Sequence, residues 1–301
     1  MAANVPNQPR RWRLSRRDVV VLVAVPCFLL MLAIPAVRLT RDSARQAHCA
    51  NNLLQIGLGL RNYHDIYGSF PPAFIADESG RPMHSWRVMT LPCWTCDTFY
   101  ECYDFHVPWD SPGNSRLTAE RGQSLQFYYD CPVDPSLEEM TSYLAVVGEA
   151  TAWPGPTPSH LEDFAKGTSH SIQLVEQTRS GIRWTEPRDL RLDGLNFTIQ
   201  SPSRMGFSRP RPRLGQAISS EHPNGAHALF ADASIEFLAA GTPPELLEDM
   251  LVIGDDKPKI PLGPRKRRRW VYDPDVVDDR AKQLPYRLEW YALDETSEPD
   301  Q

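Results

Sequence analysis

The chain has 301 residues, of which 28 are Pro and 17 are Gly, and its formal net charge is −6. Residues beyond Arg41 include 25 basic and 37 acidic side chains, and such an acidic surface argues against nucleic acid as a partner. The many Pro and Gly residues predict short elements joined by loops, with enough chain beyond residue 37 for one sizeable core or two small ones.

The first element in chain order is an uncharged run from Val19 to Val37. As a helix, this run would be about 28 Å long, which approaches the ~30 Å hydrocarbon core of a bilayer. We therefore expect a transmembrane helix at 19–37, with the lipid bilayer as its partner. A cleaved secretory signal is the alternative, but the run is long for one, and Ile34-Pro35-Ala36 is a poor cleavage site.

Basic residues before this run predict its orientation. Positive charge beside a membrane span is favoured on the cytoplasmic side. We therefore expect residues 1–18 as a cytoplasmic basic segment, a single pass through the membrane, and the bulk of the chain outside the cytoplasm. The basic residues are Arg10, Arg11, Arg13, Arg16 and Arg17.

The run continues into a segment with the period of an amphipathic helix. From Cys49 the apolar residues are spaced by four and three, which places them on one helical face. Gly57 and Gly59 would let another backbone approach closely, and Gly68 followed by Pro71 predicts the helix end. We expect this helix to be the spine on which a sheet packs. Its apolar face comprises Cys49, Leu53, Ile56, Leu60, Tyr63 and Tyr67.

Short strands are predicted for the following residues. Thr141–Val147 and Ser171–Glu176 have the apolar or alternating character of strands. Two further strands, 226–231 and 234–238, predict a hairpin that turns at Asp232-Ala233. Ser85–Met89 is either a strand or the start of a short helix.

The domain is expected to end at residue 253 with a helix over Thr242–Ile253, whose Leu246, Leu247 and Met250 would point inward. Residues 254–301 are charged and interrupted by Pro, which favours a flexible or surface extension over a further domain.

Cysteine usage suggests an oxidising compartment. Cys27 lies inside the apolar run, and the other five cysteines would lie outside the cytoplasm, where pairing is expected. A Cys-x-x-Cys spacing is present, but no second pair supports zinc and no strand-to-helix unit supports dithiol redox chemistry. We expect one disulfide between Cys49 and Cys131 and another among Cys93, Cys96 and Cys102.

Two histidines and two acids cluster around the predicted hairpin: His222, His227, Asp232 and Glu236. Zinc or calcium binding is conceivable there, but no His-Glu-x-x-His motif or Asp-rich calcium loop supports it. We expect turn roles for His222 and Asp232, and no metal or cofactor.

Three further side chains are candidates for binding or chemistry. Glu176 ends an apolar strand and would be a general acid if it were buried, although pairing with a nearby Arg is favoured. Trp109 and Trp153 could stack on sugars, although aromatic residues in loop-rich domains more often form local cores. No nucleophile elbow or phosphate-binding glycine loop is present.

Several motifs follow one another in order along the chain. One is the run from Ala44 to Ala73, which contains Cys49-Ala50-Asn51-Asn52-Leu53 near its start and Phe70-Pro71-Pro72 near its end. In another, His222 leads over nine residues to Asp232-Ala233. Further motifs are Ser85-Trp86-Arg87-Val88, Pro108-Trp109-Asp110, Cys131-Pro132, Tyr143–Gly148, Glu176 and Trp184–Leu190. Together they resemble a large bacterial family of uncharacterised prepilin-like proteins, in which the second motif is a His, nine residues and Asp-Gly.

Two positions depart from that family. The resemblance implies a prepilin-peptidase site with Gly at the cleaved bond and Glu five residues later, but Arg13-Leu14 and Asp18 stand there. Ala233 replaces the Gly of the second motif, which would cost ~1 kcal/mol if the turn needs a positive φ.

We therefore predict an α+β protein with a pilin-like long N-terminal helix, membrane-spanning and then amphipathic, packed on an antiparallel sheet with irregular loops over residues 38–253. The expected function is that of a non-enzymatic, membrane-anchored envelope protein of pilin or pseudopilin type, which associates through its N-terminal helix. The alternatives are an anchored glycan- or polymer-binding module that uses Trp109 and Trp153, and a metal-dependent hydrolase. The hydrolase would be centred on His222, Asp232 and Glu176.

Overall fold

The structure is a computed structural model that describes residues 16–95, 98–134, 139–202, 217–254, 266–272 and 286–292. The side chains of the last two segments lie outside this description, as do those of Arg16, Asp18, Val19, Leu30, Leu32, Pro35, Ala36, Arg38 and Leu39. The chain divides into two compact units, Met1–Arg45 and Gln46–Gln301.

One helix, α1 (Arg16–Tyr67), accounts for every described residue of the first unit. Its apolar side chains between positions 20 and 37 are exposed wherever they are described, with Phe28 at 63% and Met31 at 72%. Among the side chains that the structure describes, no helix is long and apolar enough to cross a bilayer. The residues of the proposed cleavage site, Arg13 and Leu14, lie outside the described residues.

In the second unit, α1 buries the face that its sequence period predicts. Cys49, Leu53, Ile56, Leu60 and Tyr63 have no exposed surface, and Tyr67 is half-buried at the edge of the same core. The helix ends at Tyr67, and Gly68 adopts a φ of 73° while its N–H bonds to the carbonyl of His64. The expected spine is therefore confirmed for residues 49–67.

A five-stranded sheet packs on this part of α1, with strand order β5-β3-β4-β8-β9. β3 (Tyr143–Val147), β4 (Ile172–Glu176), β8 (Gly225–Phe230) and β9 (Ile235–Ala239) pair antiparallel, as predicted. β5 (Leu190–Arg191) pairs parallel with β3, so the sheet is mixed rather than antiparallel throughout. The segment after β4 passes β3 before it forms β5, so β5 joins the outer edge of β3 and runs in the same direction.

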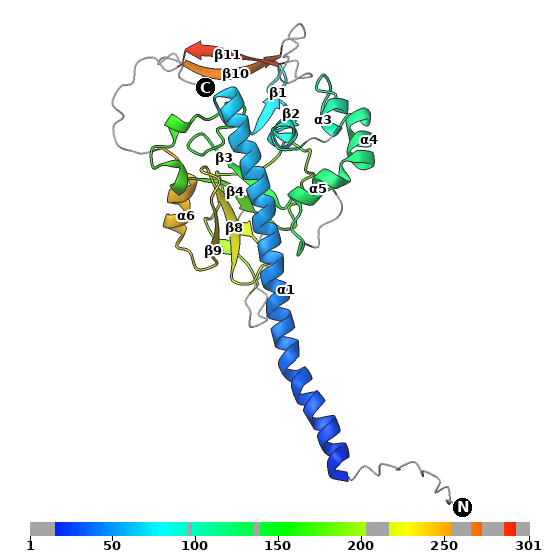
Figure 1. The fold of residues 1–301 in the computed structure, drawn as a ribbon. Helices are drawn as coiled ribbons and strands as arrows, with labels where there is room; N and C mark the ends of the chain where they lie inside the picture. Colours follow the sequence, from blue (N-terminus) through cyan, green and yellow to red (C-terminus); the bar gives the residue numbers. More distant parts are fainter. Residues whose placement is uncertain are drawn as a thin grey trace, which may run out of the picture. The chain divides into compact units, whose positions relative to one another are not determined.

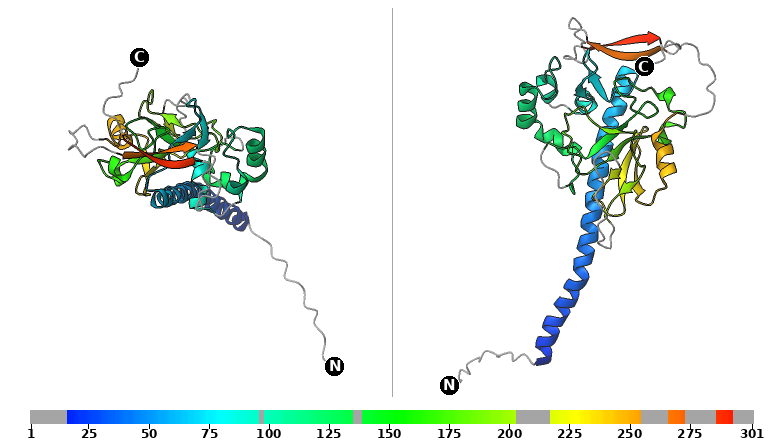
Figure 2. Two further views of the ribbon diagram at one scale, coloured as in Figure 1. Left: turned by 90° about the horizontal axis from the view of Figure 1, so that it is seen from above. Right: turned by 180° about the vertical axis from the view of Figure 1, so that it is seen from behind.

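Two apolar clusters contain the inward residues of the sheet. One includes α1 with Tyr143, Leu174 and Leu229, and the other includes Leu144, Val175 and Ala228 with α6 (Pro244–Leu251). Figures 1 and 2 show α1 crossing the sheet, with α6 beside β8 and β9. In α6, Leu247 and Leu251 are buried, but Leu246 is 50% exposed, so its predicted inward position is wrong.

The segment between α1 and β3 contains short elements. A hairpin is followed by short helices, which Figure 1 shows grouped together. Ser85 caps the first of these helices by accepting a hydrogen bond from the N–H of Arg87, so residues 86–89 are helical rather than extended. The elements are β1 (Phe74–Ala76), β2 (Pro82–Ser85), α2 (Trp86–Met89), η1 (Leu91–Cys93), α3 (Phe99–Cys102), α4 (Pro112–Arg121) and α5 (Gln123–Tyr129).

The remaining elements are short or lie in the extension. β10 (Lys266–Tyr272) and β11 (Tyr286–Ala292) form an antiparallel pair, so part of the extension is regular. The others are η2 (Leu161–Asp163), η3 (Thr168–His170), β6 (Ile199–Gln200) and β7 (Ile218–Ser219), of which the last two pair in parallel.

Candidate functional site

Four side chains with metal-binding or acid–base chemistry meet under the sheet, where α1 crosses it. The ligand atoms of Cys49, Cys131, Glu176 and His222 all lie within 4.8 Å of one another. Each of the four side chains is at most 1% exposed. This group is called the Cys–Glu–His cluster below.

Four separate elements supply the members of the cluster. Cys49 begins the buried face of α1, and Cys131 follows directly after α5 and its cap residue Asp130. Glu176 is the last residue of β4, the central strand, and His222 lies in the turn between β7 and β8. Helix α1 and strand β4 thus fix Cys49 and Glu176, while Cys131 and His222 lie in the connecting segments beside them.

The distances within the cluster are short. The Cys49 and Cys131 sulfurs are 2.6 Å apart, and His222 Nε2 lies 3.1 Å from the first and 3.3 Å from the second. Glu176 Oε1 is 3.3 Å from the Cys131 sulfur and 3.4 Å from His222 Nε2. Both sulfurs, one imidazole nitrogen and one carboxylate oxygen therefore face a common centre.

The other carboxylate oxygen of Glu176 is held by His227 on the neighbouring strand. The backbone N–H of His227 donates to Oε2 at 3.0 Å, and its Nδ1 lies 3.2 Å from the same atom. Burial alone would raise the pKa of Glu176, but the His227 hydrogen bond and the nearby His222 outweigh it and hold that pKa below the usual value. Glu176 is therefore an ionised, buried carboxylate at neutral pH.

The environment also separates the two thiols. The hydrogen bond from Cys131 lowers the pKa of Cys49 to about 6, with a smaller contribution from His222. The same contact and burial raise the pKa of Cys131 well above its ordinary value. In the structure both are free thiols, so the Cys49–Cys131 disulfide stays a prediction. Two chemistries fit such a pair, namely oxidation to a disulfide and shared coordination of a soft cation.

The structure brings two of the three residues of the hydrolase hypothesis together and leaves out the third. Asp232 lies in the β8–β9 turn, where it accepts hydrogen bonds from the N–H and hydroxyl of Ser234. This is the turn role that the sequence predicts. Glu236 is exposed. Across the hairpin, His227 pairs with Phe237 and contacts its ring, whereas Glu236 pairs with Ala228.

The two candidate tryptophans differ in exposure. Trp153 is 1% exposed, packs against Trp86 with ring centroids 5.1 Å apart, and donates its Nε1–H to the carbonyl of Gln173. Its interpretation as a sugar-stacking residue is therefore wrong, because the ring belongs to the core. Trp109 is half-buried and keeps part of its surface accessible.

The second group of cysteines is not joined where it is described. Cys93 is half-buried and Cys102 exposed, and both are free thiols. Burial raises the pKa of Cys93 to about 12, which makes it a poor nucleophile at neutral pH. Cys96, the third member of this predicted disulfide group, lies outside the described residues.

The sequence does not reveal the Cys–Glu–His cluster as a unit. Cys49 and His222 are 173 positions apart, and no spacing rule for metal ligands covers such a separation. The available signal is indirect: Cys49 and Glu176 each occupy a position where the pattern predicts a core residue. A polar or nucleophilic side chain at a buried position needs a partner.

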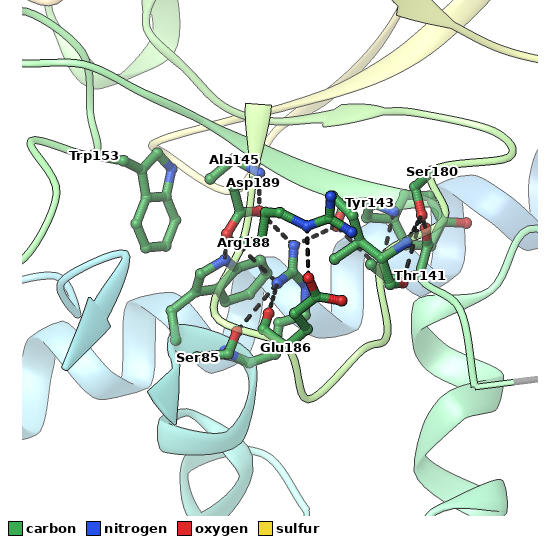
Figure 3. A network of polar contacts seen from close by, with 12 residues as sticks. Ser85, Thr141, Tyr143, Ala145, Trp153, Ser180, Glu186, Arg188 and Asp189 are labelled. Atoms are coloured by element: carbon green, nitrogen blue, oxygen red, sulfur yellow. Dashed lines mark hydrogen bonds and ion pairs between the residues drawn. The ribbon is translucent and has the colours of Figure 1, made fainter. Parts of the chain in front are cut away.

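A second buried polar network surrounds Arg87. Its guanidinium pairs with Asp189 and also donates to the Ser85 hydroxyl at 3.1 Å and the Tyr143 carbonyl at 3.2 Å. Figure 3 shows Ser85, Tyr143 and Asp189 converging at this place. Both charged side chains are fully enclosed, so we assign this network to stability rather than chemistry.

Comparison with known proteins identifies a family but no function. Residues 39–200 match a family described as "Protein of unknown function (DUF1559)". Because the match covers more than half of the chain, the chain belongs to that family. No curated protein matches the chain, and no solved structure does.

Proposed function

We propose that this member of the DUF1559 family is a membrane-anchored cell-envelope protein of pilin type, whose N-terminal helix holds and presents the domain beyond residue 45. Its role is display and lateral association rather than catalysis. The anchor is the run from Val19 to Val37, and residues 1–18 lie on the cytoplasmic side.

One observation carries this proposal: the apolar side chains that the structure describes along that run are exposed. Val20, Leu22 and Leu29 are each more than half exposed on a continuous helix. Exposed apolar area of this extent is unfavourable in water by roughly 25 cal/mol per Å². A bilayer, or the same helix of neighbouring subunits within one, would remove that cost.

The test is fractionation of cells that produce the full chain. We expect the protein to resist washing with high salt and to need detergent for release, whereas a variant lacking residues 1–37 should be recovered in the wash. Recovery of the intact chain in a detergent-free, salt-washed supernatant would overturn the proposal. The N-terminal residue of the mature protein would additionally separate a retained anchor from a cleaved signal or a prepilin-processed form.

Charge substitutions provide a sharper version of the test. Each of Val25→Arg and Leu29→Arg should weaken insertion, because an Arg at the centre of a spanning helix costs about 2.5–3.5 kcal/mol. Ala44→Arg is the matched control, since Ala44 is an exposed residue of the same helix outside the apolar run. Equal membrane retention in all three variants would show that the run is not inserted.

The glycan-binding alternative has less support. It depended on two tryptophans, of which one is buried in the core and the other, Trp109, is half-buried. No described feature adds a second aromatic platform beside Trp109. The hydrolase alternative loses one of its three residues, because Asp232 accepts a hydrogen bond from Ser234 within the β8–β9 turn.

A further inference from the structure

We propose that Cys49, Cys131, Glu176 and His222 bind a single Zn²⁺ ion that ties α1 to the sheet. This inference goes beyond membrane anchoring and does not depend on it, because all four residues lie in the second unit.

The donor set and its geometry support zinc. Zn²⁺ binds thiolate sulfur at about 2.3 Å, imidazole nitrogen at about 2.0–2.1 Å and carboxylate oxygen at about 2.0–2.2 Å, with four ligands in structural sites. These bond lengths imply ligand–ligand separations of roughly 3.3–3.8 Å in a tetrahedron. The distances from His222 Nε2 to the two sulfurs and to Glu176 Oε1 are 3.1–3.4 Å, already close to these values.

The distance between the two sulfurs, 2.6 Å, lies well below the tetrahedral range. Zinc binding therefore requires the two sulfurs to separate by about 1 Å, which small rotations of the two side chains would supply. Zn²⁺ binding would replace the thiol protons of Cys49 and Cys131, which are released to solvent, and the repulsion between the two resulting thiolates favours a longer distance between the sulfurs.

A disulfide alone leaves two members of the cluster unexplained. Glu176 is a fully buried carboxylate, and placing such a charge in the core is costly unless it is compensated. His222 and His227 already lie 3.4 Å and 3.2 Å from the Glu176 carboxylate, but a neutral disulfide would leave the convergence of Glu176 Oε1 and His222 Nε2 on the sulfurs without a role. A divalent cation at the centre would bond to both of these atoms and to both sulfurs.

The surroundings of the cluster fit a metal site as well. His227 holds Oε2 of Glu176 through its backbone N–H and so leaves Oε1 facing the sulfurs. The N–H of Cys131 donates to the hydroxyl of Ser142 at 3.1 Å, and the hydroxyl of Tyr143 donates to the carbonyl of Cys49 at 3.4 Å. Outer contacts of this kind orient ligands before the ion arrives. With four protein donors the site is closed, which is typical of a structural rather than a catalytic ion.

The first measurement is elemental analysis of the full-length protein, purified with reductant and without added metal or chelator. We expect about one equivalent of zinc per chain. Cys131→Ser and His222→Asn should reduce it to background, whereas Cys102→Ser, an exposed thiol outside the cluster, should leave it unchanged.

A second measurement needs no variant and so covers the case in which the substituted proteins fail to fold. Removal of zinc from the wild-type protein with a strong chelator should lower its Tm, and returning one equivalent of ZnCl₂ should restore it. With Co²⁺ in place of zinc, the protein should show the visible absorption of a tetrahedral thiolate site.

Two results would overturn the proposal. One is recovery of Cys49 and Cys131 joined as a disulfide from cells lysed directly in a thiol-blocking reagent. The other is failure of the reduced full-length protein to retain added zinc through desalting. Neither result bears on membrane fractionation, so the anchoring proposal is tested separately.

Discussion

The guanidinium of Arg87 and the carboxylate of Asp189 form an ion pair in which the side chains are 0% and 2% exposed. The pair joins α2 to the segment that leads into β5, and Asp189 also accepts a hydrogen bond from the N–H of Ala145 in β3 at 2.9 Å. Burial raises the pKa of Asp189 to about 6 despite the opposing effect of Arg87. The ion pair thus stabilises the fold only while both partners are present, because either one alone would be a buried charge without a partner.

We expect Arg87→Met and Asp189→Asn each to lower the free energy of unfolding by about 3–5 kcal/mol, because each leaves a buried group without its partner. The double variant should lose less than the sum of the two, since it buries no unpaired charge. Urea denaturation of all four proteins gives the coupling energy.

A surface pair is the control for this cycle. Arg116 and Glu120 in α4 form an ion pair whose side chains are 79% and 56% exposed. Removing either partner should change stability by less than about 1 kcal/mol. Strictly additive losses at Arg87 and Asp189 would mean that the buried pair contributes no coupling.

Ala233→Gly should stabilise the protein. Ala233 has a φ of 70°, a left-handed conformation that costs an L-residue with a Cβ roughly 1–2 kcal/mol. Gly removes that strain but gains entropy in the unfolded chain, so we expect a net increase of about 0.5–1 kcal/mol.

Ala239→Gly in β9 is the matched control for the turn variant, because Ala239 is an exposed strand residue without a positive φ. It should lose stability by a similar amount, since Gly loses more conformational freedom on folding than Ala does. A destabilising effect at position 233 would show that the methyl group contributes more by packing than it costs in strain.

His84 should make stability depend on pH below neutrality. Burial lowers its pKa from 6.5 to about 4, while its Nε2 lies 3.0 Å from the carbonyl of Phe105. Between these two values the unfolded chain binds a proton that the folded chain excludes, so stability falls as the pH falls. From this group alone, the free energy of unfolding should be about 2 kcal/mol lower at pH 5 than at pH 7.

The measurement compares denaturation at the two pH values in His84→Gln, whose side chain can still donate to Phe105 but does not titrate, with the wild type. The variant should lose the corresponding part of the slope. His170→Gln, at an exposed position that does not contribute to the pKa of His84, should keep it. The same slope in both variants would rule out His84 as its source.

Local patterns predict the elements of this fold better than its long-range pairings. The spacing of Leu53, Ile56 and Leu60 is sufficient to identify the buried face of α1, because helical period and burial are properties of a single segment. The β8–β9 hairpin follows for the same reason, since its strands are adjacent in sequence. The parallel β3–β5 pair depends on a contact between distant segments, for which the sequence gives no direct signal. Helix α2, which Ser85 caps locally, is one of the two alternatives that the sequence leaves open for Ser85–Met89.

The same distinction explains the candidate site. Glu176 and His222 could be proposed individually, each as a polar residue at a conspicuous place, but their meeting with Cys49 depends on how α1 crosses the sheet. For Trp153 the sequence predicts too much exposure. An aromatic residue in a Pro-rich loop looks accessible, and its burial against Trp86 depends on a contact with a distant segment.

The glycines of α1 allow close packing, but against side chains rather than the backbone that the sequence suggests. A Cβ on Gly57 would lie 2.7 Å from Cδ1 of Leu229, which is fully buried. Gly57→Ala should therefore be destabilising by roughly 1–2 kcal/mol, although Ala is the better helix former by about 1 kcal/mol.

Gly113→Ala is the control, because Gly113 is also helical but a Cβ there would meet nothing within 4 Å. This variant should gain up to about 1 kcal/mol, so thermal denaturation should move the two Tm values in opposite directions. In a Leu229→Val background the clash is relieved, and Gly57→Ala should cost less than in the wild type. An unchanged cost in that background would show that the helix, rather than Leu229, resists the added methyl group.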